Sequence, residues 1–137
     1  MQMLKTMTLL LALVLVSPYM AAAVHSPTTI EATGSVLLLN DSPQSGLWAA
    51  VADFESGTGD IVSAFENDQG DIYVITVKGD SVFEGEGLTI SGEGYLAKNG
   101  ELLTEGNGTA RISEIGMQIT VNGDTVVSGQ TVYFETK

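Results

Sequence analysis

The sequence predicts an all-β domain, a single compact antiparallel meander of about eight or nine strands that closes into a small barrel or a sandwich. Three observations predict it. From Ile30 onward, apolar and polar residues alternate with period two, as they do in strands that bury one face. Clusters of Gly, Asn and Asp interrupt this alternation at short intervals and indicate turns. Beyond the first residues, no long stretch shows the spacing of an amphipathic helix.

The N-terminus precedes this domain and has the form of a cleavable signal peptide. Lys5 is followed by an apolar run over 7–16, then by Pro18 and three alanines that end at Ala23. The run is shorter than the roughly 20 residues that span a bilayer. We therefore expect a signal peptide at 1–23, a mobile leader at 24–29 and a single secreted domain at 24–137, with no transmembrane segment after cleavage. The expected location is extracellular or in the cell envelope.

The strands of the domain follow from the alternation, and the turns between them from Gly and Asn. Asn99-Gly100 and Asn122-Gly123 predict type I′ hairpin turns, because both central residues of that turn need positive φ. Segments 68–70 and 78–80 predict slightly longer hairpin loops. The predicted strands are 30–39, 46–54, 60–66, 71–77, 81–86, 88–97, 101–113, 116–121 and 125–135.

A weak internal repeat indicates how the sheet is shaped. Segments 79–85, 100–106 and 123–129 each begin with Gly followed by an acidic residue, and each ends with a second Gly. We expect the first Gly to serve a turn and the second to lie inside a strand, where Gly marks a bulge or a sharp bend. Bends at the same offset in successive strands predict a coiled sheet, which either closes into a barrel or folds into a sandwich.

The alternation also predicts which residues form the core. Apolar side chains at every second position of a strand point to one face of the sheet. An ordinary filled core is the expected use of these residues. The predicted core consists of Leu37, Leu39, Trp48, Ile72, Val74, Val82, Leu88, Ile90, Ile119, Val121, Val132 and Phe134.

The charge of the chain excludes some partners. Removal of Lys5 with the signal peptide leaves four basic residues against seventeen acidic ones, a net charge of −13. Such a surface repels the phosphate backbone of nucleic acids, whose binding rests on cationic contacts. It also disfavours anionic membrane surfaces. We expect no nucleic-acid partner.

The inventory of side chains argues against catalysis. The chain has no Cys, and His25, its one histidine, falls in the predicted leader, so a nucleophile activated by histidine has no obvious base. No phosphate loop, dinucleotide fingerprint or zinc motif is present. Carboxylates such as Glu84, Glu86 and Glu93 leave a carboxylate-dependent hydrolase as an alternative. We expect a protein that is not an enzyme and that has no catalytic residues.

Calcium is the one cofactor that the composition allows, because it takes oxygen ligands from flexible loops. Two acidic, Gly-rich segments, 53–60 and 66–71, are the candidate loops, although neither matches a helix-loop-helix site. Asn40 and Asn107 begin N-glycosylation acceptor patterns. The candidate calcium ligands are Asp53, Glu55, Asp60, Glu66, Asp68 and Asp71.

These features lead to an expectation about function. A secreted or cell-envelope protein without catalytic residues is expected to act in surface structure, assembly or adhesion, through a β-sheet face or edge, with itself or with an envelope partner. Segments 30–39 and 130–137 are the predicted edges, because terminal strands often lie at sheet edges. The first alternative is a small extracellular binding module, with an apolar ligand inside the barrel or calcium on the acidic loops.

Overall fold

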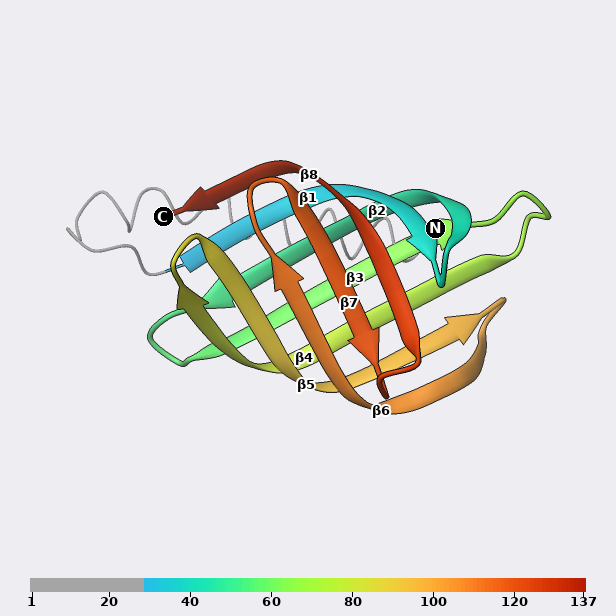
Figure 1. Cartoon of the computed structure of the whole chain (residues 1–137). Helices are drawn as coiled ribbons and strands as arrows, with labels where there is room; N and C mark the ends of the chain where they lie inside the picture. The colour runs from blue at the N-terminus through green and yellow to red at the C-terminus, as the bar shows by residue number, and fades with distance from the viewer. Residues whose placement is uncertain (1–28) are drawn as a thin grey trace.

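A computed structural model describes residues 29–137, which form a closed antiparallel barrel of eight strands (Figure 1). The prediction of an all-β meander is confirmed, and the choice that it left open is resolved in favour of a barrel. The predicted signal peptide and residues 24–28 of the leader lie outside the described residues, whereas Thr29 begins the first strand. The strands are β1 (Thr29–Leu39), β2 (Ser42–Asp53), β3 (Thr58–Glu66), β4 (Ile72–Glu84), β5 (Gly87–Lys98), β6 (Glu101–Ile112), β7 (Gly116–Val121) and β8 (Thr125–Thr136).

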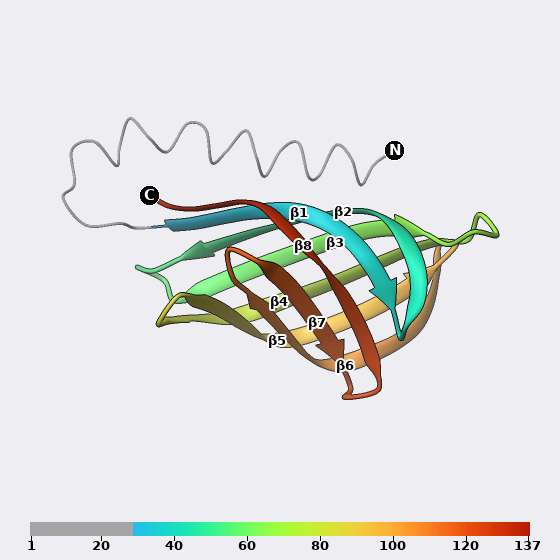
Figure 2. The same cartoon turned by 45° about the horizontal axis from the view of Figure 1, so that its top comes forward.

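The barrel closes where β1 pairs with β8, and Figures 1 and 2 both show the two strands side by side. The backbones of Thr29 and Lys137 exchange two hydrogen bonds, of 2.9 and 2.8 Å, at the end of this seam. β1 also pairs with β2 along its length. The prediction that 30–39 forms a free edge is therefore wrong, because closure gives β1 a partner on each side. Segment 130–137 is likewise paired with β1 and is free on one side at most.

Three of the four predicted turns are confirmed and one is wrong. Segment 68–70 lies in the loop between the paired strands β3 and β4, as expected. Asn99 and Gly100 have φ of 50° and 86°, and Asn122 and Gly123 have φ of 54° and 73°, as a type I′ turn requires. Segment 78–80, in contrast, lies inside β4, so the predicted strands 71–77 and 81–86 are a single strand. The expected pattern, in which the first Gly of each repeated segment lies in a turn, therefore holds for 100–106 and 123–129 but not for 79–85.

Glycines inside the strands allow neighbouring backbones to approach closely where the barrel bends. Gly79 and Gly92 lie opposite each other on β4 and β5. A Cβ atom at Gly92 would lie 2.2 Å from the carbonyl oxygen of Lys78, and one at Gly79 would lie 2.1 Å from that of Ser91. Gly129 on β8 is equally close to Ser35 of β1. Of the glycines predicted to lie inside strands, Gly106 and Gly129 do so, whereas Gly85 lies in the β4–β5 turn and Gly79, assigned to a turn, lies inside β4. Only glycine fits the close approaches at Gly79, Gly92 and Gly129.

The barrel interior is filled with apolar side chains. Trp48 is completely buried at its centre, and its indole N–H donates to the carbonyl oxygen of Gln130 at 3.1 Å. Phe65 and Tyr73 stack at one end of the barrel, with ring centroids 5.5 Å apart. At the other end, Phe83 lies between Phe54 and Phe134. The core is Ile30, Ala32, Val36, Leu39, Trp48, Ala50, Ala52, Ile61, Phe65, Tyr73, Ile75, Val77, Leu88, Ile90, Leu96, Ala110, Ile112, Met117, Ile119, Val121 and Val127.

Of the twelve predicted core residues, six belong to this core, Phe134 is partly buried and packs against it, and five lie outside it. In β4, Tyr73, Ile75 and Val77 point inward, so Ile72 and Val74 face outward. The sequence there is apolar at consecutive positions, and a shift of one residue reverses the face on which every side chain lies. The remaining three, Leu37, Val82 and Val132, are 43%, 51% and 79% exposed.

Candidate interaction surfaces

A row of apolar side chains crosses the outer surface of five adjacent strands. The row is formed by residues that lie directly opposite one another in successive strand pairs. Leu47 and Leu102, at its two ends, are 51% and 55% exposed, and Ile72 and Tyr95 beside it are 54% and 42% exposed. We call this row the outer apolar stripe. It consists of Leu47, Ala64, Val74, Ala97 and Leu102.

The six candidate calcium ligands lie at the end of β2, on β3 and in the loops before and after β3. The Asp53 carboxylate accepts hydrogen bonds from the backbone N–H of Glu55 and of Ser56, at 2.8 and 3.4 Å, so it shapes its own turn. Asp60 lies on the outer face of β3, and the exposed Glu66 ends that strand. Among residues 29–137, no three His, Cys, Asp or Glu side chains are grouped to hold a metal ion. Calcium binding stays a prediction.

Asp71, the last of these residues, links two turns at one end of the barrel. Its carboxylate accepts hydrogen bonds from the side-chain amides of Asn67 and Asn99, at 3.1 and 3.0 Å, and lies 3.6 Å from the ammonium group of Lys98. The hydrogen bonds from Asn67 and Asn99, followed by the charge of Lys98, lower the pKa of Asp71 below its ordinary value. These contacts give Asp71 a structural role in the barrel end.

We expect Asp71→Ala to lower the melting temperature at pH 7 by a few degrees. Because the pKa of the folded-state carboxyl is lowered, its contribution to stability is present above the unfolded-state pKa and is lost as pH falls through the folded-state value. The difference from wild type should therefore narrow in acid, as thermal unfolding followed by circular dichroism can show. Asp71→Asn, which keeps an acceptor oxygen, should lower the melting temperature less than Asp71→Ala does. A difference that stays constant from neutral pH into acid would contradict this role.

Three asparagines bond the turns at this end of the barrel to neighbouring strands. Each has positive φ: Asn40, Asn99 and Asn122. The backbone N–H of Asn40 donates to Val126, and its side-chain oxygen accepts the Val126 N–H at 2.7 Å. Asn99 forms the same pair of bonds with Ile72. The Asn-Gly pattern predicted two of these turns but not the bonds that their side chains make to the next strand.

The two predicted glycosylation sites are both exposed. Asn40 lies in the turn between β1 and β2, where its side-chain oxygen is engaged by Val126. Asn107 lies on the outer face of β6, and its backbone oxygen accepts the N–H of Asn122 at 2.8 Å. Use of either position as an acceptor stays a prediction.

An ion pair covers the seam between β1 and β8. The ammonium group of Lys137 lies 3.1 Å from the carboxylate of Glu31, and both side chains are largely buried. Burial raises the pKa of Glu31, and the hydrogen bond and charge of Lys137 offset only part of this effect. For Lys137, burial alone would lower the pKa, but the bond to Glu31 raises it overall. The pair holds the last described residue against β1.

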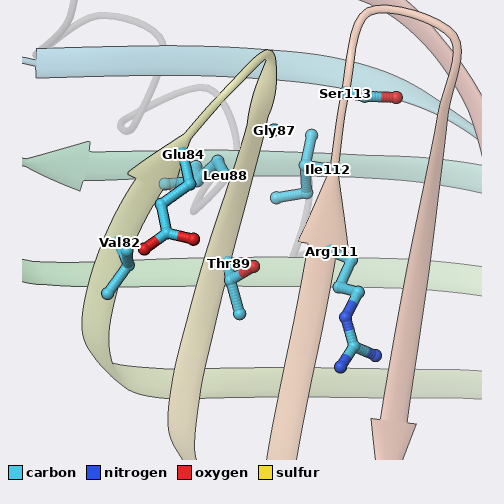
Figure 3. A pocket seen from close by; sticks show the side chains of 8 residues that line it. All are labelled: Val82, Glu84, Gly87, Leu88, Thr89, Arg111, Ile112 and Ser113. Carbon is cyan, nitrogen blue, oxygen red and sulfur yellow. The ribbon is translucent and has the colours of Figure 1, made fainter.

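Shallow hollows open on the outside of the barrel. Figure 3 shows one of about 470 Å³ between the β4–β5 and β6–β7 hairpins, with Glu84, Thr89 and Arg111 around it. Another, of about 360 Å³, has Glu93 in its wall. The three carboxylates of the hydrolase alternative are not brought into one cleft, because Glu84 and Glu93 line different hollows and Glu86 lies in the β4–β5 turn. The structure gives that alternative no support.

No protein-family model matches the chain, and neither a curated protein nor a solved structure is significantly similar to it. Within residues 29–137, no helix is long and apolar enough to cross a membrane. Any functional assignment therefore rests on the surfaces described above.

Proposed function

We propose that this chain is a secreted, non-enzymatic protein of the cell envelope or extracellular space that acts in surface structure, assembly or adhesion through the outer face of its barrel. The observation that carries the proposal is the outer apolar stripe. Large contiguous apolar patches are uncommon on soluble monomers, and where they occur they usually mark a site of interaction. An acidic chain gains solubility from its charge, so an apolar row retained across five strands is best explained by a partner.

The filled interior favours an outer surface over an internal ligand. Trp48 and its neighbours occupy the positions that a lipid-like molecule would need, and they are completely or almost completely buried. The hollows described above are open to solvent. Recognition by an outer face also requires no mobile lid or cofactor.

Removal of the stripe should weaken attachment to the envelope. We expect the substitution by serine of Leu47 and Leu102, the two exposed ends of the stripe, and of Tyr95 beside it to reduce the cell-associated share of the protein at least about tenfold. Burial of three such side chains contributes several times the roughly 1.4 kcal/mol that a tenfold change represents. Fractionation of a producing culture, followed by immunoblotting of the envelope and medium fractions, measures this share.

The control is Leu37→Ser, which removes a side chain that is 43% exposed and lies on β1, outside the stripe. It should leave the distribution unchanged. Circular dichroism must show that the triple variant keeps its fold. A folded triple variant that distributes as wild type does would refute the stripe as the binding face.

A further inference from the structure

β8 is longer than its neighbour β7, and this leaves part of it unpaired on one side. β7 pairs with β8 over 125–130 only, whereas β1 pairs with β8 as far as Thr136. Residues 131–136, which we call the β8 tail, therefore have β1 on one side and, within residues 29–137, no strand on the other. Figure 1 shows this tail continuing past the β6–β7 hairpin toward the C-terminus.

The direction of the backbone groups in the tail follows from the β1–β8 seam. Thr29 and Lys137 exchange both hydrogen bonds, and in an antiparallel ladder such pairs recur at every second residue. The N–H and C=O groups of Phe134 and Thr136 therefore point away from β1, toward the open side. Free backbone groups along a strand are a template for pairing with another strand.

Exposed apolar side chains surround this free edge. Val132 in the tail is 79% exposed, and Ile115 in the β6–β7 loop is 88% exposed. The loop is held beside the tail by the hydroxyl of Thr131, which donates to the carbonyl oxygen of Ser113 at 2.6 Å. A strand added to the tail would cover these apolar groups and satisfy the backbone at the same time.

β6 also extends beyond β7, at the opposite end of the barrel, but its edge is protected. The side-chain amide of Asn122 donates to the carbonyl oxygen of Glu105 at 2.7 Å, and a bulge interrupts the strand between Leu102 and Thr104. The tail has a register shift of its own at Val132, but its residues 133–136 pair with β1 in regular register. Charged side chains and bulges are the usual means by which an edge is blocked. Among the described residues, the β8 tail is thus the edge better suited to pairing.

We propose that two copies of this chain pair through their β8 tails in antiparallel orientation, about a two-fold axis at Phe134. This register lets the outward-pointing backbone groups of the two Phe134 residues meet, and it places Val132, where the β1–β8 pairing shifts register, opposite Thr136 of the second copy. It also places Tyr133 opposite Glu135 and brings no like charges together. Segment 131–137 carries one acid and one base, so two copies of an acidic chain meet there at a neutral surface.

The pairing names a second copy as the partner for the assembly role proposed above, but it uses a different surface. The outer apolar stripe of each copy stays free in the dimer. The two proposals can therefore fail separately. A protein that dimerises but does not attach to the envelope would contradict the proposed function alone, and one that attaches but does not dimerise would contradict the pairing alone.

Thr136→Pro tests the pairing without breaking the barrel. Proline removes an N–H that points away from β1, so the β1–β8 seam keeps its bonds. Thr136→Val, which keeps the N–H, is the matched control. In sedimentation velocity over a concentration series, we expect wild type and the valine variant to dimerise and the proline variant to dimerise at least about tenfold more weakly. A monomeric wild type at about 50 μM, or a dimer that proline leaves unchanged, overturns the proposal.

Cysteine cross-linking tests the register, because the natural chain has no cysteine. Val132→Cys and Thr136→Cys chains, mixed and oxidised, should form a disulfide-linked heterodimer, since opposite residues in a bonded pair have suitably spaced Cα atoms. Neither variant alone should form the link efficiently, because each residue lies away from its own copy across the two-fold axis. Equal cross-linking of each variant with itself would overturn the proposed register.

Discussion

Replacement of Trp48 by alanine is expected to lower the free energy of unfolding by about 3–5 kcal/mol. Trp48 is completely buried in the barrel core, where its indole bonds to β8 at Gln130 and lies against Gly34 of β1. The substitution would leave a large cavity and remove the hydrogen bond from the indole to the carbonyl oxygen of Gln130. A domain of this size is stabilised by only about 5–15 kcal/mol in total, so the variant should be marginal.

Equilibrium unfolding in urea, followed by circular dichroism, measures this loss. Fluorescence is unsuitable for the comparison because Trp48 is the only tryptophan. Leu47→Ala is the matched control, since Leu47 is the adjacent residue on the same strand but faces outward and is 51% exposed. It should cost well under about 1 kcal/mol. If both substitutions destabilise equally, the assignment of inner and outer faces in β2 is wrong.

Gly92→Ala should also destabilise the barrel, by an amount at or above the top of the roughly 1–3 kcal/mol typical of overpacking. An added Cβ atom would lie 2.2 Å from the carbonyl oxygen of Lys78 and 2.7 Å from the Cα atom of Gly79. Both are backbone atoms, so the contact cannot be relieved by rotation of a side chain. Strands β4 and β5 would have to separate where the barrel bends.

Gly87→Ala provides the control for this substitution, because Gly87 lies in the same strand and its added Cβ atom would come no closer than 3.7 Å to any neighbour. Reduced freedom of the unfolded chain should make it neutral or stabilising, by up to about 1 kcal/mol. The two variants are compared by urea unfolding under identical conditions. Comparable stability of the two would show that the bend at Gly79 and Gly92 does not need glycine.

The sequence was sufficient for the strands and for most of the turns, because these depend on local chemistry. Asn99-Gly100 and Asn122-Gly123 need positive φ whatever surrounds them, and the alternating residues around Ile90 and Ile119 point to the core as predicted. Segment 78–80 was misplaced because its Lys-Gly-Asp composition is that of a turn. Gly79 in this segment instead allows β4 and β5 to approach each other closely, and only the three-dimensional structure shows this contact.

The candidate surfaces were harder to predict. The outer apolar stripe runs across five strands that are distant in sequence, so no local motif marks it. The one available signal was the run of consecutive apolar residues that begins at Ile72, since a strand with two apolar faces does not alternate. Ile72 and Val74 were instead assigned to the core. The free edge of the β8 tail depends on the length of β7 and on the pairing of β8 with β1. The sequence alone does not show how these strands pair.

The seam between β1 and β8 has a consequence for the order of events during folding. Its hydrogen bonds join residues as far apart in the chain as Thr29 and Lys137, so the barrel cannot close until β8 is present. Loop closure over such a span is entropically costly and slow. A chain halted before β8 would leave the second edge of β1 open as a template for any neighbouring chain. Closure of the seam therefore requires that β8 has been synthesised, because β8 is the strand that covers the second edge of β1.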